Sequence, residues 1–149
     1  MLHKIDEIQG IGLHLDIVLR KIQEAYLQKF EKLGADLTIE QWVILHQIYK
    51  LRDRASQREI VQLNFRNRAT ISRVIGGLER KGFLRKTRFQ GDKKQFKLEL
   101  THQGQKMVEN LLPHAMELRN KAVNNLSLEE FETFMTVLHQ IKTNYQNQD

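Results

Sequence analysis

Apolar residues recur every three to four positions near the start of the chain, which is the spacing of an amphipathic helix. The run extends from Ile8 to Phe30, and Gly34 follows it as a residue that commonly ends a helix. A second helix is predicted to start at a capping box, in which Thr38 and Gln41 have the spacing that satisfies each other's backbone amides. The first third of the chain is therefore expected to be helical.

The last third of the chain has the same helical spacing. Residues 101–126 carry it around Pro113, which should kink the helix because proline lacks an N–H group and crowds the preceding turn. A capping box of Ser127 and Glu130 then starts a final helix, whose apolar stripe reaches Tyr145. Both ends of the chain are thus predicted to be helices with apolar faces.

Two short helices joined by a tight turn are predicted in the middle of the chain. The first covers residues 56–63. The second covers residues 67–81, with Asn67 as a natural N-cap and Gly82 as a natural residue to follow its end. This order is the outline of a helix-turn-helix.

The spacing of apolar residues then changes from 3.6 to 2. Phe96, Leu98 and Leu100 alternate with polar residues, as in a half-buried strand. Residues 83–88 are the expected partner strand, and residues 89–95 the loop between them. A hairpin directly after a helix-turn-helix is a wing. The predicted fold class is therefore mainly α, an α+β winged helix with six helices and an antiparallel wing of two to three strands.

Charge is distributed unevenly along the 149 residues, whose net charge is +6. Residues 52–97 hold fourteen basic and four acidic side chains, a net charge of +10, and the rest of the chain carries −4. A basic centre between mildly acidic arms predicts that the middle third binds a polyanion. The alternative is that these lysines and arginines only keep the surface soluble.

Helical spacing separates the second short helix into two faces. One is a compact apolar stripe, made of Ile71, Val74, Ile75 and Leu78. The other has no acidic residue and carries Ala69, Arg73, Gly76 and Arg80, with Ser72 at its margin. Small residues between arginines let a helix approach base pairs closely while the long side chains reach bases or phosphates. Thr70 is equally suited to a local capping role and to a contact.

Several other classes of protein are disfavoured by the sequence. The absence of cysteine excludes disulfides, thiolate zinc sites and cysteine nucleophiles, and it favours a reducing cytoplasm. No apolar run approaches the roughly 18 residues of a membrane span, and the first ten residues lack the apolar middle of a signal peptide. We therefore expect a cytoplasmic protein without a membrane partner.

The sequence also contains no motif that is typical of an enzyme active site or of a metal site. A phosphate-binding glycine loop and a nucleophile elbow are absent, and Gly10 and Gly12 are more simply weak points in a helix. The six histidines contain no pair spaced by three or four, so no metal site is predicted. His46, one helical turn after Trp42, is expected to be a packed or pocket-lining residue. No cofactor and no enzymatic activity are expected.

Four stretches of the sequence together carry the pattern of a known family. They are "LTIEQWVIL" at 37–45, "SQREI" at 56–60, "NRATISRVIGGLERKGFLRK" at 67–86 and "DKKQFKLELTHQG" at 92–104. With these stretches, residues 37–104 resemble the MarR family of winged helix-turn-helix transcriptional regulators.

The resemblance implies a single domain over residues 1–149 that acts as a homodimer. It assigns residues 1–34 and 102–149 to a helical dimerisation region and residues 37–101 to a winged DNA-binding lobe. It further implies a sequence-specific regulator, in the first instance a repressor, on a pseudo-palindromic operator of double-stranded DNA. A small-molecule effector would bind between the dimerisation helices and this lobe. The alternative function is a non-catalytic helical protein-interaction module with a basic face.

The resemblance and the charge pattern together name the predicted DNA-binding residues. They are Ser56, Gln57, Arg66, Arg68, Ala69, Thr70, Ser72, Arg73, Arg80, Arg88, Lys93 and Lys94. Lys94 stands where the family usually has a wing-tip arginine. The sequence also departs from the family at Asn64 and Phe65, and Phe65 is expected to fill a core position one residue late.

Overall fold

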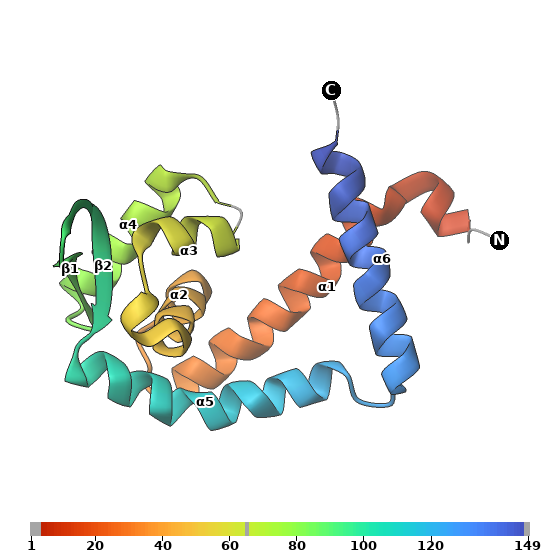
Figure 1. The fold of residues 1–149 in the computed structure, drawn as a ribbon. Coiled ribbons are helices and arrows are strands. Elements are labelled where there is room, and N and C mark those ends of the chain that lie inside the picture. Colours follow the sequence, from red (N-terminus) through yellow and green to blue (C-terminus); the bar gives the residue numbers. More distant parts are fainter. Residues whose placement is uncertain (1–3, 65, 148–149) are drawn as a thin grey trace. The chain divides into compact units, whose positions relative to one another are not determined.

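The computed structural model describes residues 4–64 and 66–147, without the side chains of residues 4–9 and of Lys93. The expected position of Phe65 therefore lies outside the described residues. Six helices, a short 3-10 helix and two strands follow one another in the described part of the chain (Figure 1). They are α1 (Lys4–Lys32), α2 (Ile39–Leu51), η1 (Arg52–Arg54), α3 (Gln57–Asn64), α4 (Arg68–Arg80), β1 (Leu84–Phe89), β2 (Asp92–Leu100), α5 (His102–Ala122) and α6 (Leu128–Gln146). The predicted fold class is confirmed.

The chain divides into two compact units, Met1–Ala115 and Met116–Asp149. The first contains α1 to α4, the hairpin of β1 and β2, and most of α5. The second contains the end of α5, which continues through Pro113 as one helix, and all of α6.

One glycine follows the end of α1, and another interrupts its helical geometry. Gly34 has a φ of 65°, a left-handed conformation that costs glycine little, and it follows the helix as predicted. The amide of Ala35 then donates to the carbonyl of Phe30 at 2.9 Å, which closes the helix end. Gly10 breaks the helical geometry of α1 with φ 65° and ψ 170°, whereas Gly12 stays helical.

Both predicted capping boxes are present. The hydroxyl of Thr38 accepts the amide of Gln41 at 3.1 Å, and the Gln41 side chain accepts the amide of Thr38 at 3.2 Å. At the start of α6, Ser127 and Glu130 make the same reciprocal pair at 3.1 and 2.7 Å. Local sequence therefore determines where α2 and α6 begin.

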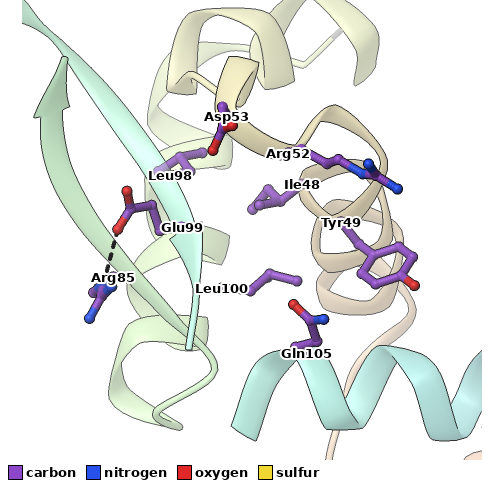
Figure 2. A pocket seen from close by; sticks show the side chains of 9 residues that line it. All are labelled: Ile48, Tyr49, Arg52, Asp53, Arg85, Leu98, Glu99, Leu100 and Gln105. Carbon is purple, nitrogen blue, oxygen red and sulfur yellow. Dashed lines mark hydrogen bonds and ion pairs between the residues drawn. The ribbon is translucent and has the colours of Figure 1, made fainter. Parts of the chain in front are cut away.

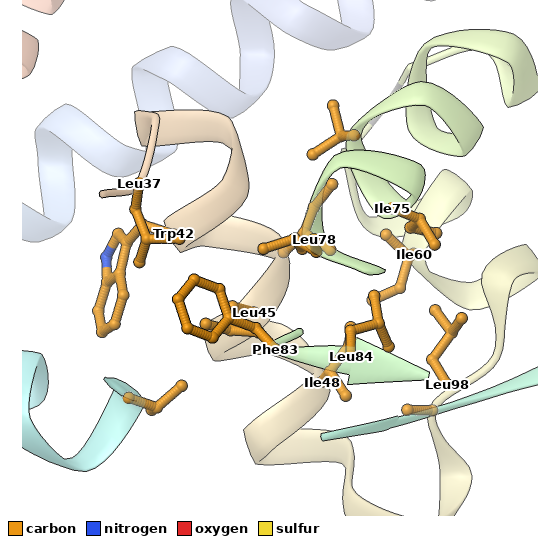
Figure 3. Close-up of a cluster of buried hydrophobic side chains, with 14 of the residues drawn as sticks. Leu37, Trp42, Leu45, Ile48, Ile60, Ile75, Leu78, Phe83, Leu84 and Leu98 are labelled. Carbon is orange, nitrogen blue, oxygen red and sulfur yellow. The ribbon is translucent and has the colours of Figure 1, made fainter. Parts of the chain in front are cut away.

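The core of the first unit lies between α2, α3, α4 and the hairpin, and side chains of α1 and α5 complete it (Figure 3). Leu45 of α2, Ile75 and Leu78 of α4, and Leu98 of β2 are fully buried in it. Burying a side chain of this size contributes about 1.5–3 kcal/mol to the free energy of folding. The apolar stripe of α4 is therefore held firmly against α2 and the wing.

Aromatic contacts join the end of α1 to α2. The rings of Phe30 and Trp42 meet edge to face, with their centroids 5.9 Å apart. His46 stacks on the other side of this group, 5.2 Å from the Trp42 ring and nearly parallel to it. His46 is 9% exposed, which confirms that it is a packed residue.

The hairpin is tighter than the sequence predicted. β1 and β2 pair antiparallel from Leu84 opposite Leu100 to Phe89 opposite Asp92, so the predicted seven-residue loop at 89–95 is wrong. Only two residues form the turn, because Gly91 adopts a φ of 82° that allows a sharp reversal. The register shifts once, between Arg88 and Phe89.

Beside the hairpin, an isolated antiparallel bridge joins Ser56 to Lys97. Through this bridge Ser56 pairs with β2 as a third strand that is one residue long. The predicted wing of two to three strands is therefore confirmed.

The C-terminal end of α4 is attached to the loop between α1 and α2 through Lys81. Its ammonium group donates to the backbone carbonyl of Asp36 at 2.9 Å and to Oε1 of Gln41 at 2.8 Å. Gln41 is also the residue that caps α2. One side chain therefore links the end of α4 to the start of α2.

The same end of α4 is attached to α5. The hydroxyl of Thr101 donates to the carbonyl of Gly82 at 2.6 Å and accepts the amide of Gly104 at 3.0 Å. A Cβ atom at Gly104 would collide with the carbonyl oxygen of Phe83. The first turn of α5 can therefore approach the backbone after α4 this closely only with glycine at position 104.

We predict that Gly104→Ala destabilises the protein by about 3 kcal/mol, because backbone and not a flexible side chain must move. Gly12→Ala is the matched control, since a Cβ there meets no atom within 4 Å and alanine favours the helix. Urea unfolding followed by circular dichroism measures both free energies. Equal stability of the two variants would contradict the close contact at Gly104.

Candidate nucleic-acid interface

The two faces of α4 differ in burial as its spacing predicts. The inner face is buried and consists of Ile71, Val74, Ile75 and Leu78. On the outer face Ala69, Arg73 and Arg80 are exposed, and Ser72 and Gly76 are partly exposed. No acidic residue lies among these outer five, so the face is positively charged.

Arg80 lies along this outer face. Its Nη1 atom is 3.4 Å from the position that a Cβ atom would take at Gly76. The missing side chain at Gly76 leaves room for the guanidinium group to fold back over the helix. Arg73 and Arg80 are seven residues apart, about 10 Å along the axis, so they mark the length of one outer stripe.

The start of α4 has a different environment. Oδ1 of Asn67 accepts the amide of Thr70 at 2.8 Å, so Asn67 is the predicted N-cap. The side chains of Thr70 and Arg66 line a hollow of about 270 Å³ between α1, α2 and α4. Arg66 also pairs with Glu40 at 3.4 Å. The predicted site residues Arg66 and Thr70 therefore line this hollow, whereas Arg73 and Arg80 lie outside it.

Ser56 and Gln57 begin α3, and little of either is accessible. They are 7% and 8% exposed. The hydroxyl of Ser56 accepts the amide of Glu59 at 3.1 Å and so caps the helix. Their predicted role in binding would require more exposure than this conformation offers.

α3, the start of α4 and the wing surround a hollow of about 490 Å³. Arg58 of α3, Arg68 of α4 and Lys94 of β2 supply three positive charges to its wall, and Asp92 of β2 supplies one negative charge. Arg58 is not among the DNA-binding residues predicted from the sequence. Its spacing from the buried Ile60 was the available signal, because two residues along a helix turn a side chain by about 200° to the opposite face.

The tip of the wing is ordered by its acidic residue. Oδ1 of Asp92 accepts the amide of Lys94 at 2.8 Å, so Asp92 stabilises the backbone of the turn. The Lys94 side chain is exposed. The side chain of Lys93, another predicted site residue, lies outside the described part of the chain.

The opposite strand of the wing carries Arg88, whose guanidinium carbon lies 4.3 Å from the centre of the Phe96 ring. The Nζ of Lys86 lies 5.2 Å from the same centre. Such distances are typical of cation–π contacts, which are attractive because the ring face is electron-rich. Lys86 also pairs with Glu79 of α4 at 3.6 Å.

Ion pairs divide the basic residues of the central segment into two groups. Five make ion pairs with acidic residues of the fold: Arg66, Lys81, Arg85, Lys86 and Lys97. Among the described side chains, no ion pair is formed by Arg52, Arg54, Arg58, Arg68, Arg73, Arg80 or Lys94. Arg52 and Arg54 lie on η1, and the other five lie on the outer face of α4 and around the hollow next to it, so most of the uncompensated charge is there.

One ion pair of this group lies at the base of the wing, where Nε of Arg85 donates to Glu99 at 3.1 Å (Figure 2). Nζ of Lys97 lies 3.4 Å from the same carboxylate. The pKa of Glu99 is lowered, chiefly by the hydrogen bond from Arg85 and further by Lys97, while partial burial acts in the opposite direction. A cavity of about 480 Å³ lies between this pair, Tyr49 and Arg52.

The described residues contain no group of three or more histidine or acidic side chains that could hold a metal ion. None of the described helices is both long enough and apolar enough to span a membrane.

Known proteins share this sequence pattern and fold. The sequence profile of the MarR family matches residues 35–95. The helix-turn-helix transcriptional regulator YybA of Bacillus subtilis (strain 168) is 30% identical over 109 residues, which are 73% of this chain and 72% of YybA. The transcriptional repressor YetL of the same organism is 29% identical over 106 residues, 70% of this chain, and the matched part is only 64% of YetL.

A structure of S. aureus MepR bound to DNA has the same fold. It superposes with a TM-score of 0.81 at 25% identity, over 90% of this chain and 97% of that one. The sequence identity to YybA, the match to the family profile and the winged-helix geometry agree with one another. The chain belongs to the MarR family of transcriptional regulators.

Proposed function

We propose that this regulator binds double-stranded DNA with the outer face of α4 in the major groove and the wing near the minor groove. The observation that carries the proposal is the acid-free face of α4, where Arg73 and Arg80 flank Gly76 and are free of ion pairs with the described acidic residues. A helix of this kind fits the major groove, and its small residues let the backbone approach the base edges.

Similar proteins support both the proposed DNA binding and the proposed mode of regulation. MepR is seen in complex with DNA, and YetL is named a transcriptional repressor. We therefore propose repression as the mode of regulation. The proposed action is non-catalytic, and it takes place in the cytoplasm, where DNA and reducing conditions suit a chain without cysteine.

The proposed DNA-binding residues fall into three groups. Ala69, Ser72, Arg73 and Arg80 form the outer face of α4 and would contact bases and phosphates. Around the adjacent hollow and on the wing, phosphate contacts are proposed for Arg58, Arg68, Lys93 and Lys94, and Arg88 is proposed to contact the DNA from the other strand of the wing. The predictions for Ser56, Gln57, Arg66 and Thr70 stay open. Ser56 and Gln57 would have to become more accessible on binding, whereas Arg66 is already exposed.

We further propose that two copies bind a pseudo-palindromic operator, with 1–34 and 102–149 as the dimerisation region. Both units expose large apolar side chains: in the first, Val18 is 56% exposed, and in the second, Phe134 is 49% and Leu128 72% exposed. Apolar area of this extent on neighbouring helical turns is expected to be covered by a partner. Half-sites would then lie about one DNA turn, roughly 34 Å, apart.

The hollow between α1, α2 and α4 is the proposed place for an effector. It is lined by Leu19 of α1, Val43 of α2 and Thr70 of α4. A molecule bound there would touch both the proposed dimerisation helix and the start of α4. It could therefore change the position of α4 relative to its partner copy, which is how an effector would release DNA.

We predict that Arg73→Ala weakens binding to the selected operator by roughly 5- to 150-fold, the equivalent of about 1–3 kcal/mol, and relaxes one base preference. The matched control is Lys106→Ala, which removes one exposed positive charge from α5. Operator selection followed by fluorescence anisotropy measures both effects. Unchanged affinity and base preference in Arg73→Ala would refute its role on the reading face.

The salt dependence separates DNA binding from the alternative of a basic protein-interaction module. If about six phosphates are contacted, affinity should fall on the order of 10³-fold between 50 and 200 mM salt. Lys94→Ala should lower the slope of log K against log salt by about 0.9. An unaltered slope would argue against a phosphate contact at Lys94, and binding restricted to a protein partner would sink the regulator hypothesis.

Phe134→Glu is predicted to weaken the homodimer by roughly 100-fold, because a carboxylate would be buried at the interface without a partner. Gln140→Glu provides the control, since residue 140 lies on the polar side of α6. Sedimentation velocity across a concentration series measures the dissociation constant. A dimer of normal strength in Phe134→Glu would exclude α6 from the proposed interface.

A further inference from the structure

We infer that Arg88, seated on the ring of Phe96, is the residue with which the wing senses the width of the minor groove. This inference rests on the proposed DNA-binding function and makes it more specific. It moves the groove-reading role from residue 94, where the sequence has a lysine, to an arginine on the opposite strand of the hairpin.

The position of Arg88 suits this role. Arg88 and Phe96 face each other in the last regular pair of the hairpin, just before the register shifts. The guanidinium carbon lies 4.3 Å from the centre of the half-buried ring, and the Arg88 side chain remains exposed. A side chain held in this way loses less conformational entropy on binding than a freely rotating one.

The ring of Phe96 lies close to side chains of both α3 and β1. It lines the hollow together with Val61 of α3, and Lys86 lies 5.2 Å from the centre of its ring. Lys86 is paired with Glu79 of α4, so it holds the ring in place and its charge is compensated within the fold. The seat of Arg88 is thereby connected to α4 and does not depend on the turn of the wing.

Lys94 is less suited to the same task. Its side chain shares the wall of the hollow with Arg58 and Arg68, next to the start of α4, where a phosphate is the expected partner. Lysine is also a flexible and strongly hydrated point charge, whereas the guanidinium group is planar and less costly to remove from water. We therefore assign a phosphate contact to Lys94 and the groove contact to Arg88.

The chemical feature that Arg88 would recognise is the narrow minor groove of an A·T tract. Narrowing brings the phosphates of the two strands together and makes the potential in the groove more negative, which favours an inserted arginine over a lysine. Specificity of this kind appears as a preference for flanking sequence and needs no hydrogen bonds that identify single bases.

The experiment compares two duplexes that share the core operator selected by the full-length protein. One is flanked at the wing position by an A·T tract, and the other by G·C pairs. The quantity measured is the ratio of the two affinities for each variant. We expect the wild-type protein to prefer the A·T flank roughly tenfold, and Arg88→Lys to lose most of this preference while it keeps the salt slope, because the charge is retained.

Variants of the two neighbouring residues complete the test. Phe96→Leu should reduce the flank preference. Phe96→Tyr keeps an aromatic ring and should therefore retain the preference of the wild-type protein. In the Arg88→Lys background Phe96→Leu should add little, because the arginine that it positions is absent. Lys94→Ala should weaken binding to both duplexes and leave their ratio unchanged. Urea unfolding of each variant shows whether it is folded, and Arg88→Lys still decides the matter if Phe96→Leu is unstable.

Each result has one meaning. If Arg88→Lys keeps the wild-type ratio, or if only Lys94→Ala changes it, the assignment to Arg88 is overturned. If Phe96→Leu changes the ratio equally with and without Arg88, Phe96 is not the seat of that side chain. If the wild-type protein selects no duplex at all, the proposed function fails. A normal selection without flank preference leaves the proposed function intact and overturns the assignment to Arg88.

Discussion

The fold depends on how the C-terminal end of α4 is held. Lys81 connects this end to Asp36 and Gln41 at the start of α2, and the backbone just after it is fixed by Thr101 and Gly104 at the start of α5. Charged hydrogen bonds and a contact too close for any side chain therefore meet at one junction. Because both α2 and α5 are attached there, a shift of either one is transmitted to α4.

A second constraint is the pairing of charge within the basic centre. Residues 52–97 carry a net charge of +10, and such an excess would be repulsive if it were spread evenly over a small lobe. The fold instead compensates the basic residues near its junctions, as with Lys86 and Glu79 or Arg85 and Glu99. Of the described basic residues in this segment that form no ion pair, most lie on α4 and around the adjoining hollow, and Arg52 and Arg54 lie on η1. Structural stability and attraction to a polyanion are thus served by different members of one basic segment.

The wing shows how departures from a family pattern can be compensated elsewhere. The sequence has Lys94 where an arginine is usual, and its turn is shorter than the spacing predicted. Asp92 stabilises this turn, while Phe96 supports an arginine on the other strand. Asn64 is a comparable case, because its amide replaces an apolar contact with a hydrogen bond of 2.7 Å to Gln47 of α2.

The sequence by itself determined the features that depend on neighbouring residues. The starts of α2, α4 and α6 follow from side chains that bind amides three positions later, and the two faces of α4 follow from helical spacing. The outer face of the candidate site, with Arg73 and Arg80, could therefore be predicted.

Only the tertiary structure decided which basic residues are compensated, that Ser56 and Gln57 are buried, and that Arg58 joins Arg68 and Lys94 around one hollow. It also decided that Arg88 lies on Phe96. These features depend on distances between elements far apart in the chain, and such distances arise from packing and strand register, which local spacing does not encode.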